Sequence, residues 1–160
     1  MTLAEALLAK LAEPRTASPG RFTLLHSDGA AGWSVAMNID KADALGCQLS
    51  EIACERISGA APDLKAWAES LANRVTGLME PLQVVEVDLL KNEALLRSDE
   101  PTIRNQKRAH FELKLEGGRR AILRRYQAAI DPFAKREPTS FVLTNEVLGN
   151  LIDDLTGSIG

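Results

Sequence analysis

The chain is poor in the residues that build metal and redox sites, with two cysteines and two histidines among its 160 residues. Two cysteines are too few for a disulfide framework. Neither histidine neighbours them, so no Cys/His zinc site is expected. We predict that Cys47 and Cys54 are buried free thiols in a reducing compartment. No metal, no other cofactor and no catalytic residue is expected, because no motif in the sequence fixes a chemistry.

Long apolar runs are also missing. No stretch approaches the roughly 18 apolar residues that a membrane-spanning helix needs. The first residues contain an early glutamate, Glu5, and no basic region followed by an apolar one, unlike a secretory signal peptide. We therefore expect a cytoplasmic protein with no membrane partner.

The composition itself is that of a globular domain, with 45% apolar and 26% charged residues. A chain of this length buries roughly 70% of its unfolded surface, enough for a core without disulfides or metals. We predict a single α+β domain over residues 1–160, with a largely antiparallel sheet of hairpins and meanders packed by three helices on one side.

Hydrophobic periodicity predicts the element order α-βββ-α-ββββ-α. Thr2 and Glu5 form a capping-box pattern at the start of the first helix. Residues 41–57 also fit a helix, but a strand is preferred because the meander would otherwise stop at two strands. Val85, Val87 and Leu89 are expected to share one face of their strand. The predicted helices are 2–13, 62–79 and 145–156, and the predicted strands are 21–27, 33–39, 47–57, two within 82–98, 108–116 and 119–127.

The register of the last hairpin follows from its side chains. A two-residue turn at Gly117 and Gly118 would set leucines against charged residues. If the pairing is shifted by one residue, with a bulge at the glycines, apolar side chains lie opposite apolar ones and acidic side chains lie opposite basic ones. We predict the bulged form, with pairs Leu113–Leu123, Leu115–Ala121, Glu112–Arg124 and Glu116–Arg120.

Charge is the most informative feature of the sequence. Residues 104–136 contain ten basic and three acidic residues, a net charge of +7, so the rest of the chain carries −10. Such asymmetry indicates a surface for an acidic partner, although a basic hairpin can also pair with acids of its own domain. Nucleic acid is the weaker alternative, because Phe111 is expected to point inward and leaves Tyr126 as the main stacking aromatic. The candidate binding residues are Arg108, Lys114, Arg119, Arg120, Arg124 and Arg125.

Two further patterns have competing interpretations. Glu86 and Asp88 share one face of a predicted strand, and with His110 and nearby arginines they would form a small acid–base site; the alternative is that they are solvated partners of salt bridges. Trp67 lies on the apolar face of its helix, where it either packs in the core or anchors a dimer seam.

The element order resembles that of the class I chaperones of type III secretion systems. The similarity lies in the opening helix 3–11, the meander from Phe22, the helix 64–79, the hairpin 84–96 and the closing helix, and the hairpin 108–127 is additional. The resemblance implies a small, acidic, usually dimeric α/β protein that holds a secreted protein without catalysis.

We therefore predict a non-catalytic, chaperone-like adaptor that binds a protein with an acidic surface, with a homodimer as a second expected assembly. Exposed strands or a helix groove would take an extended or helical segment of the partner. The alternatives are a nucleic-acid-binding protein that uses residues 104–136 and a small enzyme with a carboxylate and histidine site.

Overall fold

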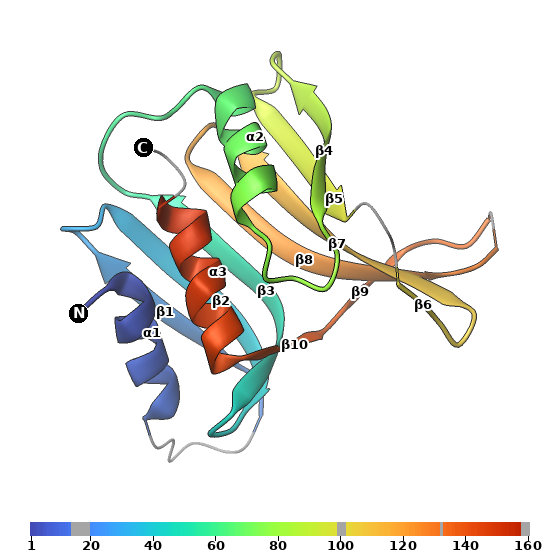
Figure 1. Ribbon diagram of the computed structural model, residues 1–160, viewed down its shortest axis with the longest axis horizontal. Helices are drawn as coiled ribbons and strands as arrows, with labels where there is room; N and C mark the ends of the chain where they lie inside the picture. The colour runs from blue at the N-terminus through green and yellow to red at the C-terminus, as the bar shows by residue number, and fades with distance from the viewer. Residues whose placement is uncertain (14–19, 99–101, 132, 158–160) are drawn as a thin grey trace.

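A computed structural model describes residues 1–13, 20–98, 102–131 and 133–157, and it confirms the α+β class and the predicted order of elements (Figure 1). Three short strands, β6, β9 and β10, are additional to the seven that the periodicity predicts. The helices are α1 (Leu3–Ala12), α2 (Leu64–Arg74) and α3 (Asn145–Gly157). The strands are β1 (Phe22–Asp28), β2 (Trp33–Ala42), β3 (Gly46–Arg56), β4 (Leu82–Asp88), β5 (Glu93–Ser98), β6 (Thr102–Arg104), β7 (Lys107–Glu116), β8 (Arg120–Ala129), β9 (Glu137–Thr139) and β10 (Phe141–Thr144).

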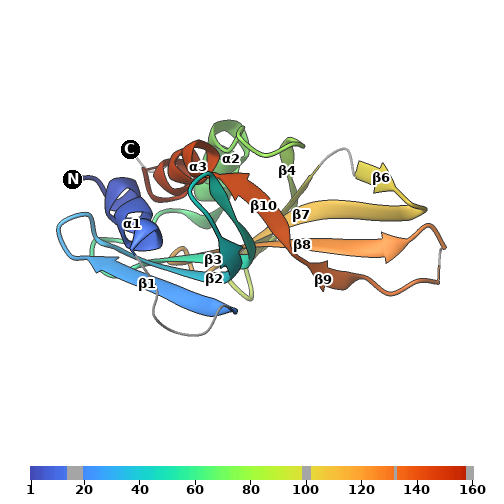
Figure 2. The same ribbon diagram turned by 90° about the horizontal axis from the view of Figure 1, so that it is seen from below.

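The strands form one antiparallel sheet in the order β1-β2-β3-β8-β7-β5-β4. Two meanders, β1–β3 and β4-β5-β7-β8, meet where β3 pairs with β8. All three helices lie on the same side of the sheet, as predicted (Figure 2). Within the described part of the chain no helix covers the other side, which we call the open face.

The core fills the space between the helices and the sheet. One cluster of buried apolar side chains joins all three helices to both meanders. Trp67 is 1% exposed and lies 6.4 Å from Trp33 between ring centres, so of its two interpretations core packing is correct and the dimer seam is not. Cys47 and Cys54 are buried free thiols, as predicted, and burial raises their pKa values to about 11 and about 12.

The predicted capping box of α1 is confirmed, with Thr2 and Glu5 each accepting a hydrogen bond from the other's backbone N–H. The predicted register of β7 and β8 is confirmed at all four pairs. Gly117 and Gly118 have φ angles of 62° and 67°, the left-handed conformation that glycine adopts at little cost. The residue type at the turn therefore fixes the pairing of the two longest basic strands.

Two predicted details are wrong. Helix α2 begins after its N-cap Asp63 and ends at Arg74, whereas the prediction ran over 62–79. Val75 and Leu78 are still buried, because the extended segment after the helix continues to pack on the core. In β4, a register shift between Val84 and Glu86 breaks the alternation that was expected to place Val85, Val87 and Leu89 on one face.

The strands β9 and β10 fill a fork in the sheet. Strand β8 pairs with β3 through residues 120–123 and with β9 through residues 125–127. Strand β3 pairs with β10 through residues 46–49. Strand β9 thus runs beside β8, the chain turns at Ser140, and β10 then runs beside β3 toward α3. A side chain at Gly46 would place its Cβ 2.3 Å from the carbonyl oxygen of Leu143, so this crossing requires glycine.

Beyond the fork, the sheet continues as a projection that we call the β-arm. It consists of β6, β9 and the far halves of β7 and β8, residues 102–111, 125–131 and 133–139 (Figure 1). Strand β6 pairs with β7, and β9 pairs with β8, so the arm is four strands wide. The arm carries much of the basic stretch away from the helices.

Candidate functional site

The structure does not gather the six candidate basic residues on one surface. Arg119 and Arg120 lie at the turn of the β7–β8 hairpin, and Arg108 lies near its opposite end. Ten residues of strand separate these ends by roughly 30 Å. Lys114 lies between them on the open face, 3.9 Å from carboxylate oxygens of both Glu93 and Glu116.

Arg124 and Arg125 point to opposite faces, because successive residues of a strand alternate. Arg124 lies on the open face and forms an ion pair of 2.6 Å with Glu51 of β3. Arg125 is buried on the helix-covered face, with its guanidinium 3.3 Å from the carboxylate of Glu80 and 4.4 Å from the ring centre of Phe111. Arg125 is therefore no part of an exposed basic surface, and the expectation that it faces a partner is wrong.

The pair of Arg125 and Glu80 is a structural element at the root of the arm. Both side chains are less than 10% exposed, and Thr102 donates a further hydrogen bond of 2.9 Å to Glu80. A buried charge is tolerated when it is paired and hydrogen-bonded. The pair thereby joins the segment after α2 to β8 and to β6.

The open face carries a row of polar side chains that crosses the sheet from strand to strand. Arg97, Glu112 and Arg124 are successive register partners on β5, β7 and β8. Arg124 contacts Glu51 of β3, which in turn accepts a hydrogen bond from Asn38 of β2. Alternating charges thus satisfy one another along this row, as the intramolecular interpretation of the basic hairpin predicts.

Glu112 is the centre of this row. Its Oε1 atom lies 3.2 Å from Arg97 Nη2 and 3.2 Å from His110 Nε2, and it also accepts a hydrogen bond from Arg136. Burial alone would raise the pKa of Glu112, but the hydrogen bonds from Arg136 and His110 and the charges of Arg136 and Arg97 outweigh burial and lower it. The Arg136 guanidinium also lies 4.1 Å from the ring centre of Tyr126.

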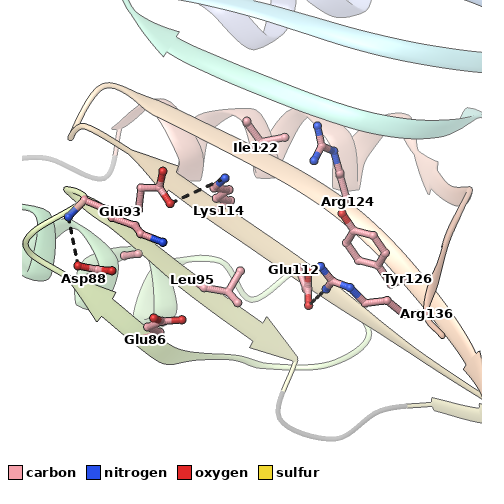
Figure 3. A pocket seen from close by; sticks show the side chains of 12 residues that line it. Glu86, Asp88, Glu93, Leu95, Glu112, Lys114, Ile122, Arg124, Tyr126 and Arg136 are labelled. Atoms are coloured by element: carbon pink, nitrogen blue, oxygen red, sulfur yellow. Dashed lines mark hydrogen bonds and ion pairs between the residues drawn. The ribbon is translucent and has the colours of Figure 1, made fainter. Parts of the chain in front are cut away.

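A hollow of about 310 Å³ lies beside Glu112 on the open face (Figure 3). Glu86 and Asp88 line one side of it, so the structure does bring them near Glu112 and its neighbour His110. Asp88 accepts hydrogen bonds from the backbone N–H groups of Leu90 and Lys91, which makes it a turn-forming residue. A carboxylate with a lowered pKa is a weak base, so Glu112 is poorly suited to acid–base catalysis. Neither Glu86 nor Asp88 forms an ion pair with a described residue, so the salt bridges predicted for these two are not found, and the ion pairs at this hollow are those of Glu112 and Glu93.

A larger groove of about 670 Å³ lies on the other side of the sheet. Its floor is the helix-facing side of the arm, with Phe111 and Arg125. One wall is the segment Leu78 and Met79 after α2, and the other is β10 with the start of α3. Phe111 and Phe141 meet edge to face at the bottom, with ring centres 5.2 Å apart. The groove therefore has an apolar base between two exposed rims.

The charge of the groove is of one sign. The described residues that line it include Arg104, Lys107 and Arg125 and no aspartate or glutamate. Arg125 is neutralised by Glu80. Arg104 and Lys107 are exposed and form no ion pair with a described residue. An anionic, partly apolar occupant would complement both properties of this surface.

Strand β10 presents a free edge along the groove. The N–H of Asn145 donates to the carbonyl oxygen of Leu45, which places Asn145, Leu143 and Phe141 in hydrogen-bonded pairs with β3. Because these pairs alternate in an antiparallel ladder, the N–H and C=O groups of Val142 and Thr144 point away from β3. In the described part of the chain, β10 has no strand on that second edge.

The groove was not predicted from the sequence. No motif in the sequence marks Met79, and β10 directly follows a stretch with many turn-forming residues, 131–140. The alternation of Phe141, Val142 and Leu143 is the signal of a strand with one buried face, and their burial follows it. The groove was missed mainly because its walls come from segments that are far apart in the chain.

Neither metal ligands among the described residues nor related proteins indicate a function for this chain. Among the described residues, no group of three histidine, cysteine, aspartate or glutamate side chains could hold a metal ion. No described helix is both long and apolar enough to cross a membrane. No protein-family model, no curated protein and no solved structure matches the chain.

Proposed function

We propose that this protein is a non-catalytic, chaperone-like adaptor that holds an extended segment of a partner protein in the groove between β10 and the β-arm. The observation that carries the proposal is the combination, in one groove of about 670 Å³, of an apolar base, two unpaired cations on the arm (Arg104 and Lys107) and a free strand edge on β10. Segments that add to a strand edge gain affinity from backbone hydrogen bonds and specificity from alternate side chains.

The expected partner segment combines apolar and acidic residues. Apolar side chains would cover Phe111, Phe141 and the exposed side chains of Met79 and Val142, which are 75% and 72% exposed. Carboxylates of the partner segment would form ion pairs with Arg104 and Lys107. We include the resemblance to the class I chaperones of type III secretion systems in this proposal, because the observed element order agrees with the order on which it rests.

Selection of peptides from a random displayed library on the intact protein tests the proposal. We expect the selected peptides to be rich in Asp and Glu among alternating apolar residues. The variant R104E/K107E should bind them at least about tenfold more weakly, since each reversed charge acts on an acidic partner. K65E/K91E, which reverses two exposed charges outside the groove, is the matched control and should bind as the wild type does.

The edge of β10 is tested with the same peptides by Val142→Pro. Proline removes an N–H that points away from β3, so the sheet should tolerate it as edge strands do. Val142→Ala removes the side chain but keeps the N–H, and it should bind more tightly than Val142→Pro. If no peptide is selected, or if the selected peptides bind R104E/K107E unchanged, the proposal is wrong. Equal binding by the two Val142 variants would exclude pairing with β10.

A further inference from the structure

The tip of the β-arm is a separate exposed surface of mixed character. It comprises the β6–β7 turn and the residues that follow β8, and the two parts are joined by a hydrogen bond from the Ile130 N–H to the Gln106 carbonyl. Three large apolar side chains are exposed there: Phe133 is 91% exposed, Ile103 60% and Ile130 45%. Three exposed apolar side chains on the joined segments of one tip make it a candidate interaction site.

Cations surround these apolar side chains. Lys107 and Arg108 point to opposite faces of β7, and Arg104 and Lys135 lie on the neighbouring segments. All four are exposed, and none forms an ion pair with a described residue. The tip is thus a basic knob with apolar side chains, and its charge opposes the −10 carried outside residues 104–136.

Hydrogen bonds to Asp131 hold the backbone turn that presents Phe133. The Asp131 carboxylate accepts a hydrogen bond of 2.9 Å from the Phe133 N–H, and the Asp131 carbonyl accepts one from the Ala134 N–H. The one acidic group beside Phe133 is therefore engaged in holding the turn.

The β4–β5 turn provides an internal comparison. Asp88 holds it by the same type of contact, and Leu90 at its end is fully exposed. Residues 86–93, which form and flank that turn, include three acidic residues and one cation, Lys91, whereas the arm tip is flanked by four cations. The two turns present similar apolar side chains in opposite electrostatic surroundings.

We propose that the arm tip docks on the surface of an anionic lipid bilayer, with Phe133 and the two isoleucines inserted among the lipids and the cations on the phosphate groups. Basic residues beside exposed aromatic and aliphatic side chains are the pattern of interfacial membrane contact. The tip lies at the end of a projection, which leaves it free to reach a surface (Figure 1). Two of its three apolar side chains are aliphatic and cannot stack on nucleobases. This proposal departs from the expectation of no membrane partner, which rested on the lack of a membrane span, because contact with a bilayer surface needs no span.

Cosedimentation with lipid vesicles tests this docking. We expect the protein to bind vesicles in which roughly a third of the lipid is phosphatidylserine and to ignore vesicles of phosphatidylcholine alone. Phe133→Ser should weaken binding at least about tenfold. R108S/K135S should weaken it by about fivefold for each cation. Leu90→Ser is the matched control and should bind as the wild type does.

A second measurement reports insertion directly. The variant Phe133→Trp should show a blue shift of its fluorescence on anionic vesicles and quenching by brominated lipid chains. Absence of binding to anionic vesicles would overturn the proposal. A second result would also overturn it: vesicle binding that is unchanged in Phe133→Ser and abolished in R108S/K135S, with an affinity for a single-stranded oligonucleotide equal to that for the vesicles. That result would mean that the tip binds polyanions in general. Peptide binding in the groove should be unaffected by Phe133→Ser, so the two proposals fail independently.

Discussion

The two halves of the β7–β8 hairpin show how the same pair of strands acquires different properties from its surroundings. The near half, residues 112–116 and 120–124, lies between β3 and β5 and under the helices. Its apolar side chains are buried, and Lys114 and Arg124 contact glutamates of the flanking strands. The far half, residues 107–111 and 125–129, is flanked only by the short strands β6 and β9, and Lys107 and Arg108 contact no described carboxylate.

This difference teaches that the net charge of a segment does not define a binding surface. In the near half Lys114 and Arg124 are paired with acids of β5 and β3, whereas Lys107 and Arg108 at the end of the far half have no ion pair with a described residue. The boundary between them is marked by Arg125 on one face and Glu112 on the other, two buried charges with different partners. Substitutions in each half should therefore have different consequences.

The largest effect is expected at the boundary, from Glu80→Gln. This variant leaves the Arg125 guanidinium buried without a counter-charge, which costs about 3–5 kcal/mol in the free energy of unfolding. The double variant E80Q/R125M removes the charge as well and should recover most of the loss. Urea unfolding measures both, and a Glu80→Gln variant as stable as the wild type would contradict the role given to this pair.

A smaller effect is expected from truncation in the near half. Leu123 is fully buried, and Leu123→Ala should lower the free energy of unfolding by about 2–5 kcal/mol through the cavity that it leaves. The counterpart on the arm is Ile103→Ala, which should change stability by less than about 0.5 kcal/mol because the side chain is exposed. Thermal unfolding of the two variants compares the halves directly, and similar losses would show that the arm is as tightly packed as the rest of the sheet.

The smallest of the three effects depends on pH. The pKa of Glu112 is lowered in the folded protein, so its stabilising contribution is present above the unfolded value of about 4.3 and is lost as the pH falls through the folded pKa. Glu112→Gln should therefore cost about 1.5–3 kcal/mol near neutral pH. The difference from the wild type should shrink steadily below about pH 4. A constant difference across that range would show that ionisation of Glu112 contributes nothing.

Much of the fold could be predicted because local patterns agree with the tertiary structure. The capping box at Thr2 and the register at Gly117 and Gly118 depend on residues close together in the chain. The end of α2 was predicted too late, since Val75 and Leu78 continue the helical spacing while packing in an extended segment. Pairing across long loops, as for β10 with β3, leaves no such local signal.

The candidate site was less predictable for the same reason. The sequence identified the basic stretch, but strand alternation and flanking acids decide which of its members are exposed. Arg125 faces Glu80, which is 45 residues away, and Arg124 faces Glu51, which is 73 residues away. Composition reports the charge of a segment, whereas only the register shows which charges already have partners.

The fork filled by β9 and β10 has a consequence for synthesis on the ribosome. Residues 46–49 of β3 and 125–127 of β8 each lack the native partner on one edge until residues 137–144 have emerged. A nascent chain that has completed β8 therefore exposes two unpaired strand edges, which are templates for aggregation. Strands β9 and β10 close both edges, and α3 then packs against α1, so this late segment protects the rest of the sheet as soon as it emerges.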